Sequence, residues 1–339
     1  MAENQTGRLE IPAPVGRLAP SPTGALHLGN ARTFLLGWLS IRQQSGTIVL
    51  RMEDLDLARA KPGAAQRVID DLKWMGLDWD FGPDTGTGRI EGIPLHQSNR
   101  LDRYREVLRQ LILDDTVYPC ECTRSKIAQQ IASAPHESGW NLLEGPIYPG
   151  TCRQSRHETD SVFEFTSEMK PALRWQFAAG EMQWLDQFLG PQTANPMLQL
   201  GDFVIGYGNG HPSYQLAVVV DDYEMGITEV VRGDDLVLST YRQQAIIRHL
   251  GWPSPKYYHV PLVFGPDGQR LAKRQGDSLT YLRCQSISAE AIVGYLAYST
   301  GMISRPEKLR PSDLIGLLDW SKVNRESFQL PQNWLDEIQ

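Results

Sequence analysis

The chain has 339 residues, of which 41% are hydrophobic and 22% charged, with 30 glycines and 22 prolines. This length exceeds one domain of ~150 residues, and the composition is that of a globular protein, which excludes a disordered or fibrous chain. The formal net charge is −7, which excludes a protein that coats nucleic acid through its bulk charge, so any RNA contact must be local. Residues 1–14 contain no apolar signal segment, and no apolar run reaches the ~18 residues of a membrane span, so we expect a cytoplasmic protein without a membrane partner.

The first predicted elements alternate between strand and helix. A short strand at residues 16–19 is followed by a turn at 20–24, a helix whose apolar residues recur every three or four positions between 34 and 41, and a strand at 47–52. This order predicts a parallel βαβ unit. Residues 62–75 and 101–113 predict two amphipathic helices, the first of which begins at a proline and ends at a glycine.

The pattern breaks between residues 118 and 156 into cysteines, glycines and prolines, which predicts an inserted subdomain. The sheet is expected to resume as strands at 203–205 and 216–220, joined by a hairpin turn at 206–210. We do not interpret that glycine-rich turn as a phosphate loop, because no helix is expected after it. A helix at 239–250, a strand at 259–263 and a turn at 265–268 follow, and the residues after 274 are expected to be helical.

Two separated motifs contain candidate chemistry. In APSPTGALHLGN at 19–30, His27 is expected at the start of a helix, where backbone N–H groups and the helix dipole favour anions, and Gly29 leaves room for a nucleotide. In RLAKR at 270–274, three cations follow a strand, where they can clamp a triphosphate and stabilise developing negative charge. Taken singly, each has a simpler alternative, a capping histidine in the first and solvated surface charge in the second.

Together the motifs resemble the HIGH and KMSKS signatures of class I aminoacyl-tRNA synthetases. LRMEDLD at 50–56, YQLAVVVDD at 214–222 and GITEVVRGDD at 226–235 extend the resemblance to glutamyl-tRNA synthetase catalytic domains, over about residues 17–330. Within that family the sequence most resembles the glutamyl-queuosine tRNA(Asp) synthetases. YPCEC at 118–122 with GPIYPGTCR at 145–153 is similar to their zinc knuckle, and the residues after 274 are too few for a helical anticodon-binding region, which we expect to be missing.

The resemblance implies an α/β fold, with a Rossmann-type parallel sheet, an inserted zinc-binding subdomain and a C-terminal helical stem-contact segment. The implied division is a polar leader at 1–15, the first half of the catalytic domain at 16–117, the inserted zinc-binding, acceptor-type subdomain at 118–200, the second half with the KMSKS-like loop at 201–284, and the helical segment at 285–339.

The same resemblance implies a ligase that activates L-glutamate with ATP as glutamyl-adenylate and transfers it to queuosine in the anticodon loop of tRNA(Asp). Mg²⁺ would accompany ATP. The implied catalytic residues are His27 and Lys273. The implied ATP-binding residues are Pro20, Thr23, Gly24, His27, Gly29, Asn30, Arg270 and Lys273.

The implied glutamate-binding residues are Arg17, Ser21, Glu53, Tyr214 and Arg232. Arginine suits the substrate carboxylate because its planar guanidinium pairs bidentately, and Glu53 would face the α-ammonium. The alternatives are internal salt bridges for the two arginines, capping for Glu53, and stabilisation of a turn or strand for the two hydroxyls.

The sequence departs from the family pattern in places. Asn30 replaces the second histidine of HIGH, and Arg270 and Ala272 replace the first lysine and the serine of KMSKS. Val218 stands where many glutamyl-tRNA synthetases have asparagine, whereas the queuosine-modifying relatives are similarly apolar there.

Three of the four cysteines have metal-ligand spacing. Cys120, Cys122 and Cys152 offer soft ligands that can fold a loop around one structural Zn²⁺, with three unligated thiols as the alternative. The resemblance implies Tyr148 as the fourth ligand, and His136 and His157 compete for that place. The remaining cysteine, at 284, is expected to be a buried thiol without a ligand role.

Two other functions remain open. One is a shortened glutamyl-tRNA synthetase that charges a tRNA acceptor end, and the other is a catalytically silent tRNA-binding module. Arg17, Glu53, Arg232 and Lys273 count against the silent module. We expect glutamate activation to proceed without tRNA.

Overall fold

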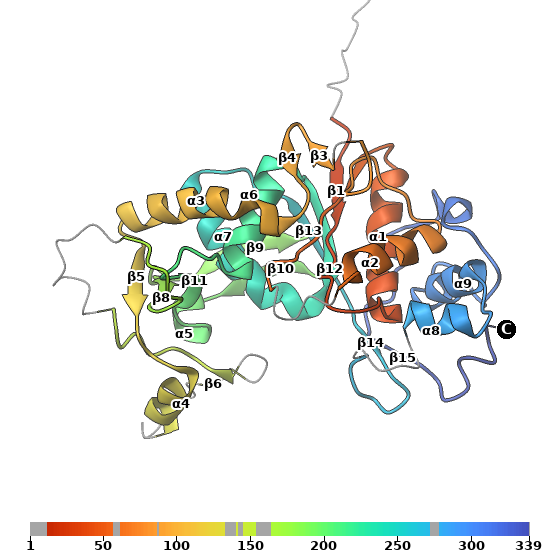
Figure 1. Ribbon diagram of the computed structural model, residues 1–339. Helices are drawn as coiled ribbons and strands as arrows, with labels where there is room; N and C mark the ends of the chain where they lie inside the picture. The colour runs from red at the N-terminus through yellow and green to blue at the C-terminus, as the bar shows by residue number, and fades with distance from the viewer. Residues whose placement is uncertain are drawn as a thin grey trace, which may run out of the picture.

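The computed structural model describes residues 12–56, 62–86, 88–132, 140–141, 145–153, 164–271 and 278–338 (Figure 1). Its largest sheet has six strands, β1 (Val15–Leu18), β2 (Thr47–Leu50), β9 (Met182–Asp186), β10 (Gly190–Ala194), β12 (Glu229–Gly233) and β13 (Lys256–Val260). Their order is β10-β9-β13-β12-β1-β2. All neighbours pair in parallel except β10, which is antiparallel to β9.

Helices cover both faces of this sheet. They are α1 (Leu28–Arg42), α2 (Ala64–Trp74), α3 (Leu101–Leu113), α6 (Tyr214–Glu224), α7 (Val237–Leu250), α8 (Leu279–Cys284) and α9 (Ala289–Ser299). Side chains alternate between the faces of a strand. On β2, Ile48 and Leu50 therefore join the core beneath α1, α2 and α9, while Val49 joins the core beneath α3, α6 and α7.

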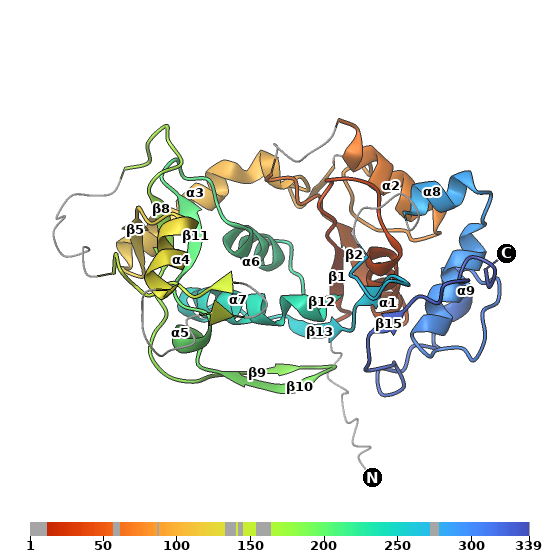
Figure 2. The ribbon, with the colours of Figure 1, turned by 90° about the horizontal axis from the view of Figure 1, so that it is seen from below.

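A smaller antiparallel sheet lies at the end of the molecule opposite α8 and α9 (Figure 2). Its strands are β5 (Val117–Cys120), β8 (Ala172–Trp175) and β11 (Phe203–Tyr207), in the order β11-β8-β5. Around it lie α4 (Arg124–Ala132), α5 (Pro196–Gln199), β6 (Trp140–Asn141) and β7 (Gly145–Pro146). The boundary expected at 200/201 falls between the two sheets in the opposite sense to the one expected, since the β9–β10 hairpin before it belongs to the large sheet and β11 after it to the small one.

The remaining elements are short. They are β3 (Arg89–Ile90), β4 (Ile93–Pro94), β14 (Val263–Phe264), β15 (Phe328–Gln329) and the 3-10 turns at Gln97–Arg100, Asp234–Leu236 and Pro311–Leu314. β14 pairs in parallel with β15. This pairing attaches the C-terminal segment to the strand that precedes the motif at 270–274.

Most predicted elements form with similar bounds, but the strand predicted at 216–220 is wrong. These residues lie inside α6, where every residue from Leu216 to Asp222 is buried. A helix buried on all sides has no 3.6-residue alternation, so its sequence resembles a buried strand. The turn after β11 does form, with Gly210 N–H donating to the carbonyl of Tyr207 at 2.8 Å. The expectation that no helix follows this turn is wrong, however, because α6 begins at Tyr214. The absence of a helix therefore does not exclude a phosphate loop here.

The C-terminal segment is less helical than predicted. After α9, residues 300–338 contain one 3-10 turn and β15, and otherwise turns and extended chain. This segment is held by single buried side chains, including Leu314, Leu330 and Trp334, which join the core beneath α1. The prediction that Cys284 is buried is also wrong. Leu279 and Leu282 occupy the inward face of the short helix α8, which leaves Cys284 exposed.

Within the described part of the chain, no helix combines the length and the apolar character that crossing a membrane would need.

Candidate active site and metal centre

A cleft of about 550 Å³ opens at the carboxyl ends of β1 and β12, where ligands bind in open parallel sheets. It brings together segments from four distant parts of the sequence. All the predicted ATP- and glutamate-binding residues that the structure describes line it, namely Arg17, Pro20, Ser21, Thr23, Gly24, His27, Gly29, Asn30, Glu53, Tyr214, Arg232 and Arg270.

His27 is the N-cap of α1, as predicted. Its Nδ1 accepts a hydrogen bond from the backbone N–H of Asn30 at 3.3 Å, so a neutral ring has its proton on Nε2. A Cβ on residue 29 would lie 3.1 Å from the His27 ring, and Gly29 therefore lets this ring fold over the first helical turn. The ring and the positive end of α1 together make this edge of the cleft suitable for an anion.

The second motif reaches the same cleft. Arg270 Nη2 lies 2.9 Å from Asp235 Oδ2, so its charge is paired with a carboxylate just after β12. Lys273 lies outside the described residues. The nearest described residues before and after Lys273 both lie close to the cleft. Leu271 lines the cleft, and Ser278 forms a β-bridge with His27, the N-cap of α1.

Two buried arginines face the inner part of the cleft. Arg17 donates to the carbonyl of Val231 at 3.4 Å, and its Nε lies 3.7 Å from Asp222 Oδ1. Arg17 thus takes part in an internal salt bridge, which was the alternative to a role in glutamate binding. Arg232 differs, because its side chain donates to His259, Thr240 and Gln243, which are all uncharged.

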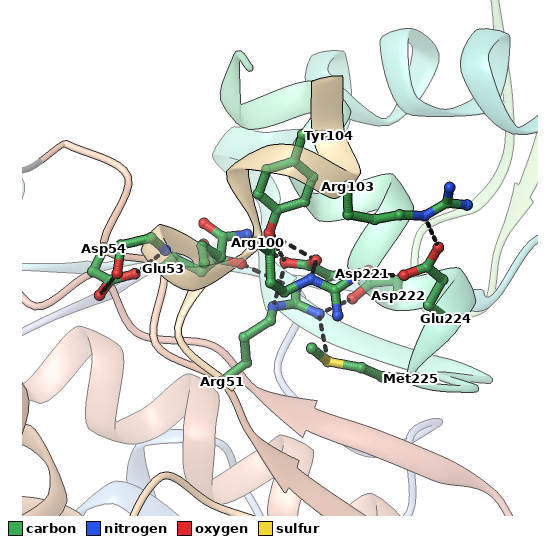
Figure 3. Close-up of polar contacts among 12 residues, drawn as sticks. Arg51, Glu53, Asp54, Arg100, Arg103, Tyr104, Asp221, Asp222, Glu224 and Met225 are labelled. Atoms are coloured by element: carbon green, nitrogen blue, oxygen red, sulfur yellow. Dashed lines mark hydrogen bonds and ion pairs between the residues drawn. The ribbon is translucent and has the colours of Figure 1, made fainter. Parts of the chain in front are cut away.

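A buried network of charges lies behind these residues (Figure 3). Arg51, which is fully buried, donates to Asp222 Oδ1 at 2.7 Å and to Glu53 Oε1 at 3.1 Å. Burial alone would lower the pKa of Arg51, but the carboxylates of Asp222, Asp221 and Glu53 raise it. Arg51 therefore stays charged and fixes the carboxylate of Glu53 at the cleft.

The network continues to α3 through Asp221, whose side chain is fully buried. Its carboxylate forms an ion pair with Arg100, with Nε 2.9 Å from Oδ1, and accepts from the Tyr104 hydroxyl at 2.8 Å and from Gln97 Nε2 at 2.7 Å. The start of α3 is therefore tied to α6 and to the wall of the cleft.

Tyr214 begins α6 and lines the cleft beside Glu53. Burial raises the pKa of Tyr214, and the negative charge of Glu53 raises it further. The hydroxyl is thus protonated at neutral pH and can donate a hydrogen bond to an anionic ligand.

The predicted metal ligands converge at the end of β5. The Sγ atoms of Cys120, Cys122 and Cys152 all lie within 4.8 Å of one another, and Cys122 and Cys152 are 3.5 Å apart. Two thiolates on one tetrahedral zinc ion lie about 3.8 Å apart, given Zn–S bonds of ~2.3 Å, so this spacing fits zinc. The Tyr148 hydroxyl lies 3.4 Å from Cys120 Sγ. The competing ligands at 136 and 157 lie outside the described residues.

Two distant residues hold this cluster in place. Arg174 on β8 donates to Cys120 Sγ at 3.2 Å, and its guanidinium carbon lies 3.8 Å from the centre of the Tyr148 ring. The backbone of Gly201 forms a β-bridge with Tyr148, and a Cβ there would lie 2.7 Å from the Tyr148 carbonyl oxygen. Within the cluster, the Tyr148 hydroxyl oxygen accepts from the backbone N–H of Cys152 at 2.7 Å.

The residues that support the two cleft arginines have no role in the sequence-based prediction. Arg51 and Asp222 lie inside the family-like motifs at 50–56 and 214–222, and Asp186 and His259 lie outside every predicted motif. One signal was present in the sequence. His259 interrupts the apolar run of β13, and a polar side chain inside a buried strand needs a hydrogen-bonding partner.

Known proteins are similar to this chain in sequence and in architecture. Residues 15–307 match the family described as tRNA synthetases class I (E and Q), catalytic domain. The chain belongs to this family and is a ligase of the class I type, with the α/β fold that the sequence implied. Its relatives from Symbiobacterium thermophilum and Rhodopirellula baltica, both called Glutamyl-Q tRNA(Asp) synthetase, are 46% and 43% identical to it. The matches cover 93% and 92% of this chain and 95% of each relative, which places the chain in the glutamyl-Q tRNA(Asp) synthetase family.

Longer relatives share the same catalytic unit. A Glutamate--tRNA ligase from Symbiobacterium thermophilum is 36% identical over 94% of this chain and 66% of its own length. The crystal structure of a glutamate tRNA ligase from Elizabethkingia meningosepticum, in complex with its amino acid, is similar with a TM-score of 0.76 and 24% identity. The match covers 96% of this chain and 68% of the ligase chain, and the two chains share the same fold.

Proposed function

We propose that the protein activates L-glutamate with ATP as glutamyl-adenylate and transfers the glutamate to queuosine in the anticodon loop of tRNA(Asp). The observation that carries the proposal is the single cleft that contains Arg17, Glu53, Arg232 and the N-terminus of α1. With Arg270 paired to an aspartate, the two other arginines and one glutamate leave a net positive charge in the lining. L-glutamate has a net negative charge, so the charges are complementary.

Each group of the substrate has a partner of suitable chemistry. Arg17 and Arg232 bind the side-chain carboxylate, because guanidinium groups form bidentate, charge-assisted hydrogen bonds with carboxylates. Glu53, held by Arg51 at 3.1 Å, accepts from the α-ammonium. The hydroxyls of Ser21 and Tyr214 complete the pocket as hydrogen-bonding groups.

In the first step, an α-carboxylate oxygen of glutamate attacks the α-phosphorus of ATP, the bond to the β-phosphate breaks, and pyrophosphate leaves. ATP lies along the turn before α1 and the second motif, against Pro20, Thr23, Gly24, Gly29, Asn30 and Arg270. His27 and Lys273 stabilise the charge that develops on the phosphates. Mg²⁺ bound with ATP would supply further charge neutralisation.

In the second step, a hydroxyl of the queuosine ring attacks the activated carbonyl carbon, and AMP leaves. The names of the relatives support queuosine on tRNA(Asp) as the acceptor. Neither step needs a covalent intermediate on the enzyme, so the rate comes from positioning and charge stabilisation.

The donor set of the cysteine cluster fits one structural Zn²⁺, with Cys120, Cys122, Cys152 and Tyr148 as ligands. The ion would join two chain segments, 120–122 and 148–152, beside the small sheet. Because protons compete with metal for thiolates, acid should release it, as measured by metal content against pH. We expect zinc loss to slow transfer to tRNA more than pyrophosphate exchange, since the glutamate pocket lies on the large sheet.

The decisive assay compares glutamate transfer to tRNA(Asp) with and without queuosine. We expect transfer only to the queuosine-containing tRNA. Equal charging of the acceptor end of both tRNAs would instead support a shortened glutamyl-tRNA synthetase. Absence of glutamate-dependent ATP–pyrophosphate exchange would support a silent tRNA-binding module.

The same exchange assay tests the pocket without tRNA. Arg232→Ala should raise the KM for glutamate about 10- to 100-fold, since it removes a hydrogen-bonded charge worth roughly 2 to 3 kcal/mol. Lys273→Ala should lower kcat instead. Arg310→Ala, at an exposed arginine outside the cleft lining, is the matched control and should change neither.

A further inference from the structure

A chain of buried polar contacts runs from the edge of the large sheet to Arg232. Asp186 ends β9, and the parallel pairing of β9 with β13 places it beside His259. Asp186 Oδ2 lies 2.6 Å from His259 Nδ1, and His259 Nε2 lies 3.0 Å from Arg232 Nε. The side chains of Asp186 and His259 are both completely buried, so solvent does not compete for these contacts.

The donors and acceptors in this chain allow one arrangement of protons. An arginine Nε always carries hydrogen, so His259 Nε2 has to be an unprotonated acceptor. The ring proton is therefore on Nδ1 and is donated to Asp186. Burial lowers the pKa of His259 to about 4, although Asp186 opposes that change. The ring is therefore neutral at neutral pH, as the geometry requires.

The carboxylate of Asp186 is oriented by a second set of donors. Its Oδ1 accepts from the backbone N–H groups of Phe188 and Leu189 at 2.9 and 2.7 Å. Its Oδ2 accepts from the His259 ring. Both carboxylate oxygens of Asp186 act only as acceptors. Replacing either oxygen with an amide NH₂ group would therefore lose a hydrogen bond.

At the other end, the partners of Arg232 occupy one edge of the guanidinium. Nε donates to His259, and Nη2 donates to Thr240 Oγ1 at 2.7 Å and to Gln243 Oε1 at 2.8 Å. Nη1 is buried and has no hydrogen-bond partner among the described residues. Because Arg232 lines the cleft, its N–H groups on Nη1 are the ones left for a ligand.

We propose that Asp186 and His259 are positioning residues for glutamate recognition, which act by holding Arg232 so that Nη1 meets the substrate carboxylate. The inference rests on the proposed function, because it takes the ligand of Arg232 to be glutamate. Asp186 sets the histidine tautomer, as a buried aspartate does in other Asp–His pairs. The tautomer in turn provides the acceptor that fixes the guanidinium.

Asp186→Asn tests this with almost no change in shape. If the new amide faced Phe188 and Leu189, it would oppose two N–H donors, so it should face His259 and donate to Nδ1. The ring proton then moves to Nε2, where it opposes the N–H of Arg232 and competes with Arg232 Nη2 for Thr240 Oγ1, which lies 3.0 Å from Nε2. We expect the KM for glutamate in pyrophosphate exchange to rise about 10- to 100-fold. The KM for ATP and the kcat at saturating glutamate should stay near those of the unaltered protein.

The matched control is Asp114→Asn, which changes an exposed Asp–His pair, with Asp114 Oδ2 3.0 Å from His249 Nε2. It should leave both KM values unchanged. A folded Asp186→Asn variant whose KM for glutamate rises less than about twofold would overturn the inference. An equal rise in both KM values would overturn it too, because a merely structural role moves both.

A second measurement reads the histidine tautomer in the unaltered protein. In ¹⁵N NMR spectra of the unaltered protein, His259, assigned by its loss in His259→Gln, should carry its proton on Nδ1. A proton on Nε2, or on both nitrogens at neutral pH, would overturn the inference. The Arg232→Ala result separates the two proposals. If it leaves the KM for glutamate unchanged, the proposed pocket fails, whereas an effect of Arg232→Ala without one of Asp186→Asn refutes only the positioning role.

Discussion

Asp71 on α2 connects the turn before α1 to the start of α8. Its Oδ2 accepts from the backbone N–H of Leu26 at 3.4 Å, and its Oδ1 accepts from the hydroxyl of Thr280 at 3.4 Å. Only 3% of Asp71 is exposed. Burial raises its pKa to about 6, against the opposing effect of these hydrogen bonds. Asp71 therefore holds the turn before α1 and the start of α8 together, at an energetic cost once it is ionised.

The pKa of an aspartate in an unfolded chain is ~3.9. Between about pH 4 and pH 6 the folded state keeps a proton on Asp71 that the unfolded state has already lost, so stability falls as the pH rises through this window. The stability that protonated Asp71 provides is fully present below about pH 4 and lost above about pH 6. The difference between the two pKa values corresponds to about 3 kcal/mol, taken as an upper value.

Asp71→Asn should remove this dependence, because asparagine has the same shape, stays neutral and can still accept from Leu26. We expect the free energy of unfolding to rise by up to about 3 kcal/mol near pH 7, with no gain near pH 4, as measured by urea denaturation. Asp70→Asn, at the exposed neighbouring position, is the control and should have little effect. An equal gain at both pH values, or a loss near pH 7, would refute the idea that the ionised Asp71 is strained by burial.

Other substitutions test the supports of the two sites. Gly201→Ala places a Cβ 2.7 Å from the Tyr148 carbonyl oxygen and should lower the zinc content. Gly226→Ala is the control, because Gly226 has a similar φ of +66° but open space around it, and it should leave the zinc content unchanged. Equal zinc contents in the two variants would contradict this prediction. Asp221→Asn removes one of the carboxylates that neutralise Arg51 and Arg100, which keep Glu53, Asp222 and Glu224; it should cost roughly 1 to 3 kcal/mol in chemical denaturation, and no measurable loss would contradict the network. Gly294→Ala should lower Tm despite the helix propensity of alanine, because its Cβ would lie 1.5 Å from a backbone oxygen of the C-terminal segment; a higher Tm would contradict that packing.

The residues that line the cleft could be predicted because they lie in continuous motifs that resemble a known family. The fold explains why three of them share one site. Arg17 lies in β1, Glu53 follows β2, and Arg232 lies near the end of β12, and strands that run in parallel bring their carboxyl ends to one edge of the sheet. Reasoning from hydrophobic periodicity failed for α6, where burial on all sides removed the pattern that distinguishes helix from strand.

The partners of these residues could not be predicted in the same way. The chain contains 40 acidic and 33 basic residues, so no single pairing follows from composition. Arg51 meets Asp222 across 171 positions, and Arg174 meets Cys120 across 54. Such pairs depend on the crossing of elements that are already folded. A sequence pattern can identify a cation, but only the packing of α6 against the sheet decides which carboxylate neutralises it.

The β9–β10 hairpin shows what additional signal the sequence contained. Trp184 and Asp186 are buried while Leu185 between them is exposed, which is the alternation of a strand with one covered face. An aspartate at an inward position has to meet donors, since an unpaired buried carboxylate is costly. Its partner, His259, is likewise a polar residue inside an apolar strand, 73 positions away. Two buried polar residues on different strands can thus satisfy each other, and the parallel pairing of β9 with β13 brings these two together in the large sheet.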